Sequence, residues 1–194
     1  MAAGSIHPVV DGAGVPDDLD RLWTPHRMAY ISGADRPAPG AERNECPFCR
    51  APDLPPAESL VVTRAKTAYV VLNLYPYNPG HLLICPYRHV ADYTDLAEDE
   101  TVEVARLTQA AMRVIRATSG AHGFNVGMNQ GAVAGAGIAA HLHQHVVPRW
   151  TGDANFLPVV AHTKAVPELL ADTRAKLAAA WPAHRSAPVE GGDA

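Results

Sequence analysis

The chain has 194 residues, of which 47% are hydrophobic and 19% charged, and its formal net charge is −4 at pH 7. This composition is typical of one globular domain, and it lacks the basic excess of proteins that bind nucleic acid or anionic membranes. The apolar runs are shorter than the ~18 residues of a membrane span, and the three cysteines cannot all pair in disulfides. Residues 1–18 also lack the basic start and apolar core of a secretory leader. We therefore expect a cytoplasmic protein that binds neither nucleic acid nor membranes.

Both ends of the chain are predicted to be mobile. Residues 1–18 and 186–194 are rich in Gly, Pro and Asp and contain few large apolar side chains that could pack. Residues 19–185 are expected to fold as a single domain.

Five segments have the β-branched and aromatic residues of strands and are bounded by Pro, Gly and Asn. They cover residues 60–64, 67–74, 80–86, 123–129 and 140–148. The turn YPYNP between the second and third is short enough for an antiparallel hairpin.

Two segments are predicted to be helical. Residues 94–120 have acidic residues in their first turns, apolar residues on one face, and Gly120 after the end. The second helix covers residues 167–181 and begins at Pro167, because the first turn of a helix tolerates proline. The expected fold class is α+β, with a mostly antiparallel sheet of about five strands, one long helix and a C-terminal helix.

The stretch HLHQHVVPRW places His141, His143 and His145 at alternate positions. On a β-strand these side chains share one face, roughly 7 Å apart, and Pro148 is expected to end the strand. Such a row can be a solvated surface, a pair of zinc ligands with an open position for water, or a histidine nucleophile between binding groups.

A glycine-rich loop, NQGAVAGAGIAAH, runs into the histidine strand. Its GAGIAA portion is not a dinucleotide fingerprint, because a strand follows where that motif requires a helix. Gly131, Gly135 and Gly137 can instead bring backbone N–H groups close to an anion. The alternative is a merely flexible loop.

The pair Cys46 and Cys49 in CPFC indicates zinc binding or redox chemistry. Redox chemistry is disfavoured because the surrounding sequence lacks a thioredoxin-like βαβ pattern. Zinc needs two further ligands, and reduced thiols without a metal are the simpler alternative. Cys85 lies in an apolar segment and is predicted to be a small core residue.

Together these segments resemble the HIT superfamily of nucleotidyl hydrolases and transferases. HLHQHVV is similar to its histidine triad motif, LNLYPYNPGHLLICPYRH to its asparagine and Pro-Gly-His turn, and MNQG to its polar loop. RLWTPHRMAYI and VVPRWTGDANFLP are similar to the branch that acts on diadenosine polyphosphates. The resemblance spans about residues 20–160 and implies a HIT-like fold, a homodimer and nucleotidyl transfer.

The resemblance also implies residue roles. His143 would attack the α-phosphorus to form a nucleotidyl-histidine, with its tautomer fixed by a backbone carbonyl near His141. The residues implied to contact the phosphate or complete the histidine cluster are His145, His81 and either Gln130 or Asn129. Asn73 matches the residue that holds the ribose. Trp150 could stack on adenine, contact a second subunit or pack in the core.

A structural zinc is implied at Cys46, Cys49, His89 and His141, with no cofactor needed for the chemistry.

Arg149 could meet a distal phosphate or only pair with Asp153. Two positions depart from the family pattern. Gln144 stands in place of an apolar residue, and Ile138 stands where relatives often have Ser or Thr.

The predicted reaction is phosphorolysis of diadenosine tetraphosphate to ADP and ATP, with inorganic phosphate as the acceptor. The alternatives are a hydrolase of the same substrate or of an aminoacyl or phosphoramidate nucleotide, a nucleotide-binding regulator, and a zinc hydrolase that uses the histidines directly. The sequence does not distinguish water from phosphate as the acceptor.

Overall fold

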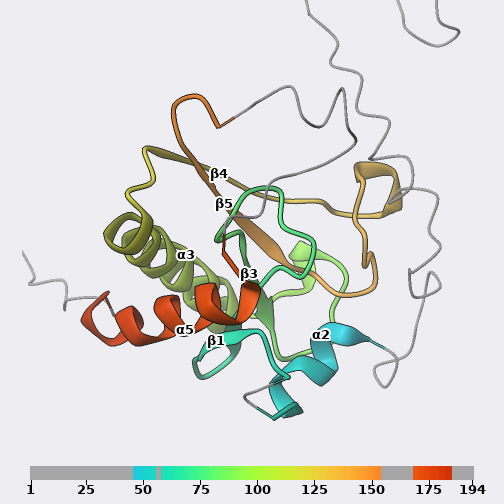
Figure 1. The fold of residues 1–194 in the computed structure, drawn as a ribbon. Coiled ribbons are helices and arrows are strands. Elements are labelled where there is room, and N and C mark those ends of the chain that lie inside the picture. The colour runs from blue at the N-terminus through green and yellow to red at the C-terminus, as the bar shows by residue number, and fades with distance from the viewer. Residues whose placement is uncertain (1–45, 56–57, 154–167, 185–194) are drawn as a thin grey trace, which may run out of the picture.

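The computed structural model describes residues 46–55, 58–153 and 168–184. A five-stranded sheet lies at the centre of this part, in the order β1-β2-β3-β5-β4, and all neighbouring strands are antiparallel (Figure 1). The strands are β1 (Val61–Arg64), β2 (Ala68–Leu72), β3 (Leu82–Pro86), β4 (Gly123–Met128) and β5 (Gln144–Arg149). The predicted α+β class and antiparallel sheet are confirmed. The end segments predicted to be mobile, residues 1–18 and 186–194, lie outside the described residues.

Two helices cover one face of the sheet: α3 (Glu98–Ser119) and α5 (Leu170–Ala180). Alternate residues of the central strands, such as Val70, Ile84 and Val146, form a fully buried cluster with the inner side of α3. The long helix ends as predicted at Gly120, whose positive φ of 62° suits glycine. The second helix begins at Leu170 rather than in the predicted first turn at Pro167, which lies outside the described residues.

The opposite face of the sheet carries a smaller cluster that includes Tyr69, Leu83 and Cys85. The short helix α2 (Pro47–Arg50) packs Phe48 against it. Cys85 is fully buried, so its predicted core role is confirmed. The remaining elements are the 3-10 turns η1 (Ala51–Asp53), η2 (Tyr93–Asp95), η3 (Ala132–Ala134) and η4 (Trp181–His184).

The histidine segment differs from the prediction of a strand over residues 140–148. Strand β5 begins only at Gln144, because the backbone N–H of Leu142 donates to the carbonyl of Val90 at 2.7 Å rather than to a neighbouring strand. The predicted stop at Pro148 is also wrong. Pro148 pairs with Phe124 of β4, and the β3 ladder has already ended opposite Val146. The missing N–H of proline therefore interrupts no pairing with β3.

Gln144 faces the helices, where its amide donates a hydrogen bond to the hydroxyl of Thr108 on α3. Thr108 is buried, so the two polar side chains satisfy each other inside the core. This pair accounts for the departure of Gln144 from the apolar pattern.

Among the described residues, no helix is both long and apolar enough to cross a membrane.

Candidate active site

His143 is held as a neutral imidazole with one nitrogen available. Its Nδ1 lies 2.9 Å from the backbone carbonyl of His141. A carbonyl only accepts, so Nδ1 must carry the proton and Nε2 keeps its lone pair. Burial lowers the pKa of His143 below its ordinary value, which favours the uncharged ring. A neutral, oriented Nε2 is what a histidine nucleophile requires.

His145 lies beside His143, with ring centroids 5.0 Å apart. Its Nδ1 is 2.9 Å from Nε2 of His81, a fully buried residue on the turn before β3. Burial lowers the pKa of His145 to about 4. Its Nε2 is buried and has no hydrogen-bond partner within the described residues. Such an atom requires a partner, and a bound substrate oxygen can supply one.

The three histidines do not form the single row predicted on one strand face. His141 and His143 precede β5, and their rings have different partners. Nδ1 of His141 lies 3.4 Å from the sulfur atoms of both Cys46 and Cys49. The geometry therefore separates a metal-type cluster at His141 from the adjacent rings of His143 and His145.

The metal-type cluster contains all four residues that the resemblance implied. Their ligand atoms lie within 4.8 Å of one another, and Nδ1 of His89 is 3.2 Å from the sulfur of Cys49. The set is Cys46, Cys49, His89 and His141. Two thiols and two imidazoles are the donors that zinc prefers in closed tetrahedral sites.

The hydrogen bonds of His141 suit a metal ligand. Its Nε2 lies 2.9 Å from the carbonyl of Pro86, which can only accept, so Nε2 carries the proton. The lone pair of Nδ1 then points at the thiols. Metal-bound histidines commonly donate their second N–H to a carbonyl in this way. The residues present therefore fit a zinc ion.

Phe48 connects the two sites, although the sequence analysis did not single it out. Its ring lies 4.8 Å from that of His143 and 5.6 Å from that of His141, centroid to centroid. It sits between the two cysteines, and its carbonyl accepts a hydrogen bond from the hydroxyl of Tyr69 at 2.5 Å. The sequence feature that could have identified Phe48 is its position as an aromatic residue inside the Cys-x-x-Cys turn.

The glycine loop bends through two residues in the left-handed region, Gly131 at φ 80° and Gly135 at φ 85°. These angles disfavour any residue with a Cβ, so both glycines are required by the backbone. Gln130 accepts a hydrogen bond from the N–H of Tyr93 at 3.2 Å, which turns its amide oxygen toward η2. Asn129 is half-buried just after β4. The phosphate contacts implied for this loop, including Gly137, stay predictions.

Other implied residues have partners within the chain. The side-chain nitrogen of Asn73 contacts His81, and its side-chain oxygen accepts from the N–H of Tyr75 in the turn after β2. Its predicted contact with a ribose is untested. Trp150 packs on the helix side and donates from Nε1 to the carbonyl of Ser119 at 3.0 Å. This position favours its core interpretation, and its contact with a nucleotide stays a prediction.

Arg149 forms a two-pronged ion pair with Asp153, at 2.6 and 2.8 Å. The predicted ion pair of Arg149 with Asp153 is thereby confirmed, and its contact with a distal phosphate stays a prediction. Asn78 also donates to Asp153 at 2.9 Å, which ties the turn before β3 to the end of β5.

The profile of the HIT domain matches residues 55–152, about half of the chain, and this range contains the triad. The chain belongs to the HIT family. It is 50% identical over 178 residues to the protein named AP-4-A phosphorylase of Mycobacterium tuberculosis, covering 90% of this chain and 91% of that one. The predicted family is confirmed.

Two further similar proteins have lower identity to this chain. The chain is 33% identical over 98 residues to the asymmetrical bis(5'-nucleosyl)-tetraphosphatase of Schizosaccharomyces pombe, covering 50% of this chain and 53% of that one. A solved structure of a zinc-bound histidine triad family protein from Mycobacterium smegmatis matches with a TM-score of 0.59 and 26% identity, covering 73% of this chain and 96% of that chain. The fold and family are therefore supported from both sequence and structure.

Proposed function

We propose that the protein is a nucleotidyltransferase that cleaves diadenosine tetraphosphate by phosphorolysis to ADP and ATP. The observation that carries the proposal is the fixed tautomer of His143, which leaves Nε2 as a buried nucleophile. Beside it, Nε2 of His145 has no hydrogen-bond partner among the described residues. The AP-4-A phosphorylase relative, 50% identical over most of both chains, supports this substrate.

The reaction proceeds in two displacements. Nε2 of His143 attacks an α-phosphorus, an N–P bond forms, and the bond to the bridging oxygen breaks to release ATP. An oxygen of inorganic phosphate then attacks the same phosphorus, the N–P bond breaks, and ADP leaves. Dividing one difficult substitution into two steps is the benefit of covalent catalysis. Nearby hydrogen-bond donors stabilise the charge on the equatorial oxygens.

Incubation with diadenosine tetraphosphate, with and without inorganic phosphate, is the experiment that tests this function. We expect equal amounts of ADP and ATP, formed only when phosphate is present. AMP and ATP formed without phosphate would instead identify a hydrolase. Tight binding without turnover would identify a nucleotide-binding regulator.

We also propose that the Cys46, Cys49, His89 and His141 cluster binds a structural zinc ion. The four ligands would close a tetrahedral site and leave no open position for substrate, so the metal would hold α2 against the residues before β5. The nucleophile is an imidazole, and the chemistry at His143 then needs no cofactor. A cytoplasmic location is part of the proposal, since reduced thiols persist there.

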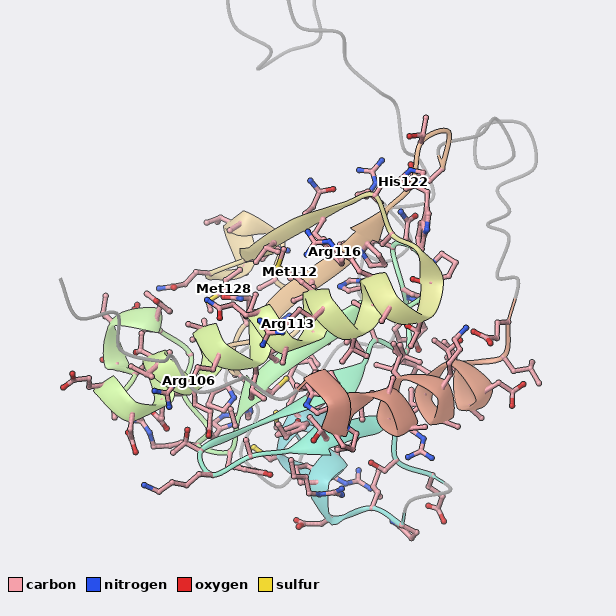
Figure 2. The ribbon with its side chains drawn as sticks, turned by 90° about the vertical axis from the view of Figure 1, so that its left-hand side faces the viewer. Arg106, Met112, Arg113, Arg116, His122 and Met128 are labelled. Atoms are coloured by element: carbon pink, nitrogen blue, oxygen red, sulfur yellow. The ribbon has the colours of Figure 1, made fainter. Side chains whose placement is uncertain are left out.

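The proposed enzyme is a homodimer that pairs through β4. This strand lies at the edge of the sheet, and Val126 at its centre is 46% exposed. An edge strand presents unpaired backbone groups to a second copy. Figure 2 shows Met112 and Arg116 of α3 near this strand, and the guanidinium of Arg116 lies 4.9 Å from the ring centroid of Phe124. Apolar and cationic side chains therefore flank the exposed edge.

Val126→Lys is expected to convert the dimer to a monomer, because a lysine on an exposed edge strand opposes edge-to-edge pairing. Light scattering after size-exclusion chromatography measures the change. Val102→Lys is the matched control, since Val102 is 41% exposed but lies on α3. If only Val102→Lys produced a monomer, the dimer interface would lie at α3 rather than at β4.

A further inference from the structure

The hydrogen bonds around His81 fix its tautomer. The backbone N–H of Tyr77 lies 3.1 Å from Nδ1 of His81, and a backbone amide can only donate. The side-chain nitrogen of Asn73 is 3.2 Å from the same Nδ1. The orientation of this amide is set because its oxygen accepts from the N–H of Tyr75 at 3.0 Å. Nδ1 of His81 therefore holds a lone pair, and the ring proton is on Nε2.

The same reasoning extends to His145. Nε2–H of His81 points at Nδ1 of His145 at 2.9 Å, so Nδ1 of His145 must accept. The proton of a neutral His145 then lies on Nε2, the buried atom that has no partner in the described part of the chain. The ring of Tyr77 stacks on that of His145 with an interplanar angle of 18° and a centroid distance of 5.8 Å, which restricts its rotation.

We infer that Asn73 and Tyr77 are positioning residues that determine, through His81, which nitrogen of His145 carries the proton. His145 thereby presents a neutral N–H donor to an oxygen of the phosphate that His143 attacks. No proton moves along these hydrogen bonds. Together they select one tautomer of His145 before the substrate binds. The last step rests on the proposed function, because the oxygen belongs to the proposed substrate.

The opposite tautomer would be unfavourable for the reaction. It would direct a lone pair of His145 at an anionic oxygen and set two N–H donors against each other between Nδ1 of His145 and Nε2 of His81. A donor that is already oriented needs no rearrangement in the transition state, and loss of one such donor typically lowers kcat about 10²-fold to 10³-fold. The residues of the turn before β3 thus influence the rate without touching the reacting atoms.

Nitrogen-15 NMR of the histidine-labelled full chain tests the tautomer directly. A protonated ring nitrogen and one with a lone pair have widely separated chemical shifts. At neutral pH we expect a lone pair on Nδ1 and a proton on Nε2 in both His81 and His145. A proton on Nδ1 of either residue would overturn the inference. This result does not depend on turnover, so it is distinguishable from a failure of the proposed function.

A matched pair of variants tests the functional consequence. His81→Gln places an amide nitrogen near the position of Nε2 and can still donate to His145, whereas His81→Met fills a similar volume and cannot. We expect His81→Gln to keep the tautomer of His145 and to lose less than about tenfold in kcat. His81→Met should lose the single tautomer and, like other losses of an oriented donor, about 10²-fold in kcat.

Equal losses of kcat in the two variants would show that His81 only fills space, and would overturn the inference. Thermal unfolding identifies a variant that does not fold. If His81→Met is unfolded, the NMR spectra of the native chain and of His81→Gln decide the question. A lone pair on Nδ1 of His145 in both supports the inference, and a proton there in either contradicts it.

Discussion

Replacing His143 with asparagine is expected to lower kcat on the order of 10⁴-fold or more, because it removes the atom proposed to form the covalent bond to phosphorus. In the proposed complex, other residues would make most of the contacts to the nucleotide, so binding should change little. Steady-state kinetics and calorimetric titration with diadenosine tetraphosphate measure the two effects separately.

His145→Asn is the comparison for this variant. It removes one donor rather than the nucleophile, so we expect a smaller loss, equivalent to roughly 3 kcal/mol in the activation free energy. Both asparagine variants should unfold at temperatures close to that of the native chain. Near-normal turnover by His143→Asn would eliminate this residue as the nucleophile.

Removal of the proposed zinc ion is expected to have the largest effect on stability. An ion that binds only the folded state stabilises it by about 4 kcal/mol when free zinc is a thousandfold above Kd. For a chain of this size, chelation should then lower Tm by roughly 10 °C. Cys46→Ser should have a similar effect and bind less zinc, while Cys85→Ala should keep its zinc because Cys85 lies outside the cluster. Calorimetry and metal analysis measure these changes.

Turnover provides a second test of the metal. Below its lowered Tm, the stripped protein should still convert substrate, because the proposed nucleophile is the imidazole of His143 and not a metal-bound water. If stripped, folded protein were inactive while Cys46→Ser retained full activity, the histidines themselves would hold a catalytic metal. The proposed mechanism would then be wrong.

The sequence predicted the sheet well because its strands are short apolar runs between clear turn residues. All five segments appear as strands, with ends that differ by a few residues. The largest difference is at His141, which lies outside the strand because its side chain contacts Cys46, 95 positions away in the sequence. Alternation along a strand is a local signal, and it cannot reveal a contact made across the fold.

The sequence identified the histidines and cysteines of the candidate site but not the groups that orient them. Spacing and resemblance identified His143, His145 and the four residues of the metal-type cluster. The carbonyl of Pro86, the N–H of Tyr77 and the ring of Phe48 were missed. The first two are backbone groups, whose contacts leave no trace in side-chain identity and follow only from the folded geometry.

The central claim is that His143 forms a covalent nucleotidyl intermediate. Rapid quenching of the native protein with diadenosine tetraphosphate labelled at the α-phosphorus tests it most directly. We predict a label that is stable in base, labile in acid and located on His143. Label on a different residue, or full turnover with no trapped label at any quench time, would contradict the account.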